Sequence, residues 1–244
     1  MTRAGQPAPG RRPAKPGPRA TATRSGPFPI EAVLMRVREA VRRLEAPSVA
    51  AGAGAGRRRD PFRVLVSCVI SLRTKDEVTA VASARLLSRA GSPRGLLALK
   101  EAEIARLIFP AGFYRVKARQ LRAICARLIE AFGGRVPDTI DALLTLPGVG
   151  RKTANLVVAE GFGRPAICVD VHVHRIVNRW GYVRTRTPEQ TEMRLRGKLP
   201  RHWWIPVNPL LVAFGRAICR PVSPHCSRCP VAGTCRRVGV TRSR

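Results

Sequence analysis

Acidic residues are scarce in this chain. Of its 244 residues only 15 are Asp or Glu, against 45 Lys or Arg, and the formal net charge is +30. No stretch approaches the roughly 18 uninterrupted apolar residues that a membrane-spanning helix requires, so we expect no membrane segment. The large excess of positive charge favours a polyanionic partner. Because the basic residues are spread along the whole chain and not gathered on one amphipathic helix, we expect nucleic acid and not a membrane surface.

Lysine is also rare, at six residues. This indicates a codon bias towards arginine, and such a bias is the alternative explanation for the basic composition. It does not by itself keep acidic residues so scarce, so the expectation of a polyanionic partner stands.

The first 27 residues contain six basic residues, six prolines and no acidic residue. This composition predicts a disordered basic tail over residues 1–27, since it offers no apolar face to bury. The tail either adds non-specific attraction to phosphates or is inert. It lacks the apolar core of a secretory signal, so we expect a cytoplasmic protein, associated with the nucleoid if the source is bacterial.

Most of the remaining chain shows helical periodicity. Apolar residues recur at helical spacing from Ile30 to about Ala46, and an Ala-Gly stretch at 50–56 separates this segment from the rest. Asp60 before Pro61 predicts a helix start, and a domain boundary is expected near residue 55. Further helices are predicted at 62–72, 77–90, 101–109, 116–132, 139–144, 151–161, 171–180, 188–199 and about 209–218. Because no segment shows the alternation typical of a strand, the predicted fold class is all-α.

The segment Leu146–Ala154 reads LPGVGRKTA and lies between two helical patterns. Gly148 and Gly150 allow a tight turn that exposes backbone amides at the start of the next helix, an arrangement that binds phosphate. Taken alone, two glycines between helices are more typical of an ordinary helix–helix turn. The context that changes this interpretation is Asp170, which lies 18 positions after Lys152 in the segment VDVHVHR.

These two motifs together resemble the helix-hairpin-helix DNA glycosylase superfamily, and specifically its endonuclease III branch, over roughly residues 30–236. The resemblance implies a two-lobed fold. One lobe is a six-helix domain at 55–164 that carries the hairpin, and the other is an iron-sulfur cluster domain formed by 28–54 and 165–244. It also implies a monomer that binds double-stranded DNA with damaged or abasic sites across the cleft between its lobes.

In that family the hairpin lysine and the aspartate of the VD segment carry the reaction, which implies these roles for Lys152 and Asp170. The residue types suit the chemistry, because only an amine can attack C1′ and remain as a protonated imine that permits β-elimination. An ordinary lysine, with a pKa of about 10.4, is a poor nucleophile at neutral pH. Arg151 and the helix N-terminus are expected to supply an activating positive field. The carboxylate would stabilise the cationic transition state. The alternative roles are a phosphate-binding lysine and a helix N-cap.

The predicted function is a bifunctional DNA glycosylase and abasic-site (AP) lyase that removes oxidised pyrimidines in base excision repair. A mismatch or adenine glycosylase of the same superfamily is the first alternative, although such monofunctional relatives usually lack the hairpin lysine. A non-catalytic iron-sulfur DNA-binding protein is the second alternative.

Four of the seven cysteines lie close together near the C-terminus. Cys219, Cys226, Cys229 and Cys235 form the pattern C-x6-C-x2-C-x5-C in a segment rich in Arg and Pro. A disulfide pair is disfavoured in a reducing compartment, and structural zinc is more often held by two short C-x2-4-C pairs. The spacing resembles the [4Fe-4S] loop of the endonuclease III family, which implies a cluster that staples this loop and presents its arginines to DNA phosphates. The three other cysteines lie on apolar stretches and are expected to be buried.

An enzyme that acts at C1′ inside a duplex must flip the nucleotide out and fill the gap. The segment Ser71–Asp76 is similar to the family's S-x-Q-x-x-D segment, but Arg73 stands where the family has glutamine. An arginine only donates hydrogen bonds, so the opposite-base preference of this chain is left open. Phe113 stands in a loop that carries a wedge residue in the family, with core packing as the alternative. Asp76 either contributes to the site or caps the following helix.

His172 and His174 follow the aspartate two positions apart. On a helix this spacing places them about 200° apart, which prevents both from binding one metal. We expect structural or DNA-backbone roles for them. Trp203 and Trp204 are expected to anchor the core near the cluster domain.

Overall fold

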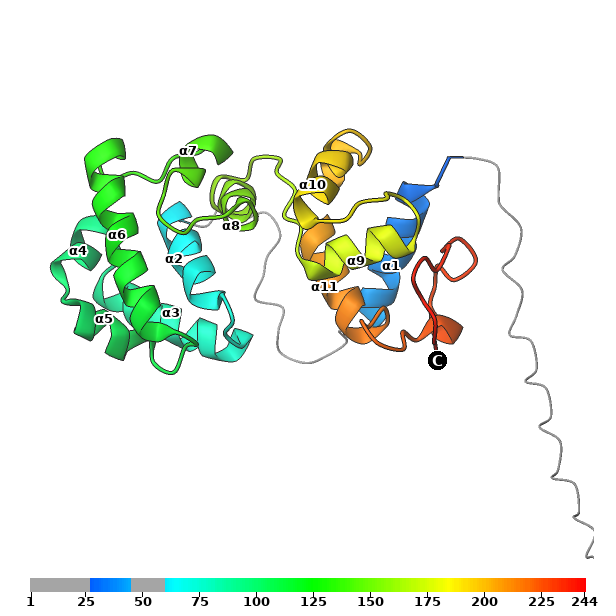
Figure 1. The fold of residues 1–244 in the computed structure, drawn as a ribbon, viewed down its shortest axis with the longest axis horizontal. Coiled ribbons are helices and arrows are strands. Elements are labelled where there is room, and N and C mark those ends of the chain that lie inside the picture. Colours follow the sequence, from blue (N-terminus) through cyan, green and yellow to red (C-terminus); the bar gives the residue numbers. More distant parts are fainter. Residues whose placement is uncertain (1–26, 45–59) are drawn as a thin grey trace, which may run out of the picture.

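The computed structural model describes residues 27–44 and 60–244, and its regular secondary structure consists of helices (Figure 1). The α-helices are α1 (Ile30–Leu44), α2 (Pro61–Ser71), α3 (Asp76–Arg89), α4 (Pro93–Ala98), α5 (Glu101–Ile108), α6 (Tyr114–Phe132), α7 (Ile140–Leu144), α8 (Arg151–Leu156), α9 (Val171–Arg179), α10 (Pro188–Arg196) and α11 (Val207–Ala217). A π-helical turn, Val157–Gly161, follows α8, and 3-10 turns lie at Arg201–Trp203 and Cys226–Arg228. No strand occurs in the described ranges, so the all-α prediction is confirmed.

Helices α2 to α8 form one lobe around a single apolar core. The central helix is α2, which is buried around most of its circumference and packs against α3, α6 and α8. Asp60 caps it as predicted, because its Oδ1 accepts a hydrogen bond from Phe62 N at 2.9 Å and Pro61 occupies the first helical position. A helix that is apolar on nearly every face is held by packing, which explains why α2 fixes the centre of this lobe.

The second lobe consists of α1, α9, α10, α11 and the C-terminal loop, around a separate core. In Figure 1, α1 (blue) lies beside α11 (orange), although most of the chain separates them in sequence. Leu34 of α1 is fully buried in this core, as are Trp180 and Phe214, whose rings lie 6.4 Å apart. The first described helix therefore packs into the lobe that the C-terminal segments build.

Three helical segments differ from the predicted ones, and one of them is the helix predicted at 188–199, which ends at Arg196. Helix α4 was not predicted, because six residues are too few to show periodicity. Its local start signal is nevertheless clear, since Ser92 Oγ accepts from Gly95 N at 3.1 Å and Pro93 follows the cap. The predicted helix 151–161 changes to a π-helical turn after Leu156. In that turn Gly161 packs so closely against α2 that a Cβ would lie 2.9 Å from Pro61 Cα.

The predicted boundary near residue 55 and all but the last residue of the predicted basic tail lie outside the described residues. Within the described ranges, no helix has the length and apolar character needed to cross a membrane. The lobes are joined by an extended segment that leads into α9, where Asn208 of α11 donates a hydrogen bond to the Cys168 carbonyl at 3.1 Å.

Candidate active site and DNA interface

The hairpin between α7 and α8 depends on its two glycines for different reasons. Gly148 has φ +70°, in the left-handed region, and a Cβ there would lie 2.3 Å from Gln120 Nε2. The same nitrogen donates a hydrogen bond to the Gly148 carbonyl at 3.1 Å, so α6 supports the turn. Gly150 starts α8 with an extended backbone, and open space surrounds the position its Cβ would take. The turn is therefore held at Gly148 and accessible at Gly150.

Lys152 and Asp170 line one cavity of about 260 Å³, although they come from different lobes. Lys152 is exposed on the first turn of α8, and Asp170 immediately precedes α9. Asp170 Oδ1 accepts hydrogen bonds from the backbone nitrogens of His172 and Val173, each at 2.9 Å. Asp170 is therefore a helix N-cap, and the cap holds its carboxylate beside the cavity. The structure brings together the two residues that the sequence motifs single out.

A carboxylate that the sequence analysis missed, Glu192 of α10, lines the same cavity. Its side chain is almost fully buried and receives two hydrogen bonds from Arg151, at 3.0 and 2.8 Å, and one from Arg196 at 3.0 Å. Burial opposes ionisation, but these charge-assisted hydrogen bonds outweigh it and hold the pKa of Glu192 below its ordinary value. Arg151 is thus paired. Glu192 therefore offsets the positive charge that Arg151 was expected to supply near Lys152.

Arg73 and Phe113 belong to two different loops and meet on the surface. Both are non-glycine residues with positive φ, 53° and 57°. Phe113 is 61% exposed, which excludes core packing for its side chain. The Arg73 guanidinium carbon lies 5.3 Å from the centre of the Phe113 ring, a cation–π distance. Side chains of this size rarely adopt positive φ, and such strain concentrates at functional sites.

Asp76 does not cap α3. The N-cap position is Lys75, which makes no side-chain capping bond, and Asp76 is the first residue of the helix. Its Oδ2 instead accepts a hydrogen bond from Arg216 Nη2 of α11 at 2.7 Å. The capping alternative is therefore wrong, and the residue forms an ion pair between the lobes. Since both side chains are exposed, this pair contributes little to stability.

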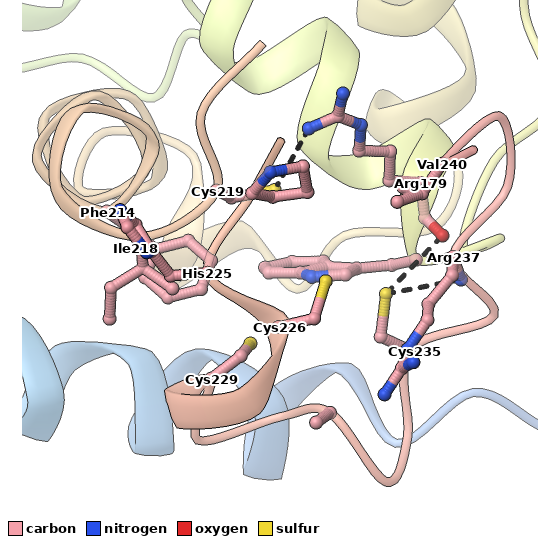
Figure 2. A pocket seen from close by; sticks show the side chains of 13 residues that line it. Arg179, Phe214, Ile218, Cys219, His225, Cys226, Cys229, Cys235, Arg237 and Val240 are labelled. Atoms are coloured by element: carbon pink, nitrogen blue, oxygen red, sulfur yellow. Dashed lines mark hydrogen bonds between the residues drawn. The ribbon is translucent and has the colours of Figure 1, made fainter. Parts of the chain in front are cut away.

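The four C-terminal cysteines line one pocket beside α9 and α11 (Figure 2). All four are free thiols. Burial raises the pKa of the Cys229 thiol to about 11 and also raises that of Cys235. In the described ranges, however, no three His, Cys, Asp or Glu side chains stand in a metal-ligating group. The structure gathers the four cysteines at one pocket without arranging their sulfurs as a ligand set.

Hydrogen bonds from neighbouring residues reach two of these sulfurs (Figure 2). Arg179 Nη1 lies 3.6 Å from Cys219 Sγ, and the Arg237 backbone nitrogen lies 3.4 Å from Cys235 Sγ. Hydrogen bonds to sulfur are among the features that tune iron-sulfur sites. Exposed arginines are frequent in the same segment, at Arg216, Arg220, Arg228, Arg236 and Arg237.

The remaining residues singled out from the sequence have structural contacts. His174 Nδ1 lies 2.6 Å from Thr191 Oγ1, whereas His172 bonds within α9, so the two histidines have different partners. Trp203 is buried in the second core as predicted, and Trp204 is half-buried against it. The other cysteines, Cys68, Cys125 and Cys168, are buried as predicted, and burial raises the pKa of each to about 12.

Comparison with known proteins defines the class to which this fold and site belong. Residues 66–201 match the model of the HhH-GPD superfamily of base excision DNA repair proteins. The solved structure of a trapped endonuclease III–DNA covalent intermediate matches with a TM-score of 0.73 and 34% identity, over 85% of this chain and 94% of that one. A thermostable thymine-DNA glycosylase, at 24% identity and a TM-score of 0.70, shares the fold over 84% of this chain and 94% of its own. The chain has the helix-hairpin-helix glycosylase fold.

Sequence relatives narrow this class. Endonuclease III of Thermotoga maritima is 50% identical over 176 residues, which are 72% of this chain and 83% of that protein. Endonuclease III of Bacillus subtilis is 37% identical over 178 residues, 72% of this chain and 81% of that protein. Endonuclease III-like protein 1 of Mus musculus is 43% identical over 171 residues, 69% of this chain, but the match spans only 57% of the mouse protein. The chain belongs to the endonuclease III family.

Proposed function

We propose that this chain is a bifunctional DNA glycosylase and AP lyase of base excision repair, and that it removes oxidised pyrimidines from double-stranded DNA. The observation that carries the proposal is the cavity that Lys152 and Asp170 share. A lone lysine beside a hairpin suits phosphate binding, whereas an amine and a carboxylate that line one cavity can divide the chemistry at one sugar carbon. Membership of the endonuclease III family supports this activity.

Lys152 is the proposed nucleophile. Its unprotonated Nζ attacks C1′ of the flipped nucleotide, and the bond from C1′ to the base breaks, so that the base leaves with the bonding electrons and takes up a proton. Opening of the sugar ring, with a proton delivered to O4′, leaves a protonated imine between Nζ and C1′. Loss of a C2′ proton then forms a C2′–C3′ double bond and expels the 3′ phosphate with the electrons of the C3′–O bond. Water hydrolyses the imine and releases Lys152.

Asp170 has the complementary role. Positive charge develops at C1′ and O4′ as the base departs, and a carboxylate held at the cavity stabilises that charge. The same group can accept or return a proton while the ring opens. Because its two capping hydrogen bonds fix the side chain before DNA binds, little reorganisation is needed during the reaction.

The hairpin and the two surface loops have proposed roles in holding DNA. The accessible backbone around Gly150 and the exposed arginines of the C-terminal segment contact phosphates. Arg73 and Phe113 fill the gap that the flipped nucleotide leaves. Arg73 donates hydrogen bonds to acceptor atoms of the orphaned base, because its guanidinium has donors only.

We also propose that Cys219, Cys226, Cys229 and Cys235 hold a [4Fe-4S] cluster. Four free thiols at one pocket, with N–H donors directed at two of the sulfurs, fit the chemistry of such a group. Burial raises the pKa of Cys229 and Cys235, and the positive charge of bound iron would offset that cost when their thiolates bind it. When bound, the cluster would cross-link the C-terminal loop through four cysteines. Arg179 supports that loop independently, through hydrogen bonds to the carbonyls of Arg220 and Pro221 at 2.6 Å each.

Replacing Cys229 with serine is expected to remove the cluster. The content of iron and of acid-labile sulfide should fall from about four of each per chain to a small fraction of that value. Affinity for duplex DNA should fall about tenfold, because the arginines of the loop lose their fixed arrangement. Both quantities are measured on the purified full chain, with Cys125→Ala in the first lobe as the control that retains them. Full iron content in Cys229→Ser would contradict the ligand assignment.

The proposed function is tested by borohydride trapping of the wild-type protein on two paired duplexes, one with an abasic site and one with thymine glycol. Covalent adducts on both are expected, because the imine forms after base removal as well as on a ready-made abasic sugar. An adduct on the abasic duplex alone would retain the lyase and overturn the substrate class. No adduct on either would favour a monofunctional glycosylase or a DNA-binding protein.

A further inference from the structure

Lys117 is a buried cation that the proposed chemistry does not use. It lies in the first turn of α6 and is only 4% exposed. Its Nζ donates to the carbonyls of Ile70 and Leu72, at 2.6 and 2.5 Å, and to Thr74 Oγ1 at 2.8 Å. Three donors thus meet three neutral oxygens at the C-terminal end of α2, where the helix dipole favours a cation. An ammonium is costly to bury. A buried lysine with a partner for each of its three donors therefore requires an explanation.

The hydrogen bonds of Lys117 surround the loop that carries Arg73. Leu72 and Thr74, the neighbours of Arg73 on either side, are both bound by the ammonium. Thr74 Oγ1 in turn accepts a hydrogen bond from Gly112 N at 3.1 Å. A Cβ on Gly112 would lie 2.4 Å from the Arg73 carbonyl oxygen, so the two loops touch without room for a side chain. The clamp therefore joins the loop after α2 to the loop before α6.

The backbone of the same residue joins the clamp to the second loop, through a helical hydrogen bond that does not depend on the side chain. Its backbone nitrogen donates to the Phe113 carbonyl at 3.0 Å, which starts α6 from a residue in the left-handed conformation. Arg73 and Phe113, the two strained residues, thus lie on opposite sides of the contact that Lys117 organises. A backbone conformation of this kind persists only where the surroundings impose it.

We infer that Lys117 is a positioning residue that preforms the Arg73–Phe113 pair as a single wedge before DNA binds. The inference rests on the proposed function, since it takes this pair as the group that fills the gap in the duplex. Without the clamp, both residues can relax to ordinary backbone conformations, and the ordering must then take place during binding. The expected consequence is slower extrusion of the nucleotide, with the Lys152 cavity unchanged.

A comparison of duplex and single-stranded substrates isolates this role. A nucleotide in a duplex must be unstacked and replaced, whereas a single-stranded abasic site needs no wedge. In the full-length, cluster-loaded protein, Lys117→Met is expected to slow single-turnover trapping on an abasic duplex about 10- to 100-fold. Trapping on the same strand without its complement should change less than about twofold. Lys100→Met, at an exposed position before α5, is the matched control and should leave both rates unchanged.

A second variant covers the case in which Lys117→Met folds poorly. Thr74→Val keeps the side-chain shape and introduces no charge, but it removes the oxygen that links Lys117 to Gly112. Like Lys117→Met, it should lower the ratio of the duplex rate to the single-strand rate, but by a smaller factor. Thermal unfolding of each variant identifies any loss of rate that results from a destabilised fold. Equal slowing on both substrates by the folded variants would overturn the inference.

Combined variants separate the inference from the proposal on which it rests. Phe113→Ala alone should slow duplex trapping, and adding Lys117→Met to it should cause less than about a twofold further change, because residues that act through one structure are not additive. If Phe113→Ala leaves duplex trapping intact, the wedge assignment falls and the inference falls with it. If Phe113→Ala slows the duplex reaction and Lys117→Met slows it further by its full factor, the wedge stands and the positioning role is overturned.

Discussion

A Lys152→Gln variant is expected to lose borohydride trapping on an abasic duplex by at least about 10³-fold. The reason is chemical, because an amide cannot form an imine with C1′. Among the described side chains that line the cavity, Lys152 alone is an amine. Glutamine keeps most of the side-chain length and polarity, so the cavity should keep its shape. The loss therefore reports the amine itself.

The measurement is the initial rate of adduct formation in single turnover, together with affinity for a duplex that carries a stable tetrahydrofuran in place of the abasic sugar. Affinity should fall no more than about threefold, since one positive charge is removed from a very basic protein. Lys100→Gln, exposed in the first lobe, is the control for a generic loss of lysine. Adducts at the wild-type rate in Lys152→Gln would return this residue to the role of a phosphate ligand and direct the search to the other lysines.

Much of the fold could be predicted because its signals are local. Asp60 before Pro61 marks the start of α2 and does cap it, and long helices such as α6 show their periodicity over several turns. Helix α4 was missed because a capping signal at Ser92 without periodicity is weak evidence. Periodicity likewise could not indicate the π-helical turn after α8, nor the close approach of its last residue, Gly161, to Pro61, 100 positions away.

The residues of the candidate site likewise could be predicted only where a sequence motif marks them. Lys152 and Asp170 were found because their motifs carry a family resemblance. Glu192 was missed because its partner Arg151 lies 41 positions away and no local pattern marks a long-range ion pair. The helix-cap alternative for Asp76 was wrong because α3 begins at Asp76 itself, one residue earlier than predicted. Its ion pair with Arg216 could not be predicted either, since that partner belongs to the other lobe.

The second large effect concerns Asp170, where the sequence left two roles open. The structure shows that Asp170 caps α9, and that observation alone would explain the residue without any catalytic role. Asp170→Asn separates the two roles, because asparagine is as good an N-cap as aspartate but cannot stabilise a cation as a carboxylate does. The rate of trapping on the thymine glycol duplex is expected to fall about 10²- to 10⁴-fold, in the range that proton transfer and charge stabilisation supply.

The free energy of unfolding should fall by less than about 1 kcal/mol in Asp170→Asn, since only the charge at the helix N-terminus is lost. Asp170→Ala is the complementary variant: it should lose activity to a similar extent and a further ~1 kcal/mol of stability, because the acceptor for His172 N and Val173 N disappears. Thermal unfolding and single-turnover rates on the same preparations distinguish the outcomes. If asparagine preserves both stability and activity, Asp170 is a cap alone, and a different group must stabilise the charge that develops at C1′.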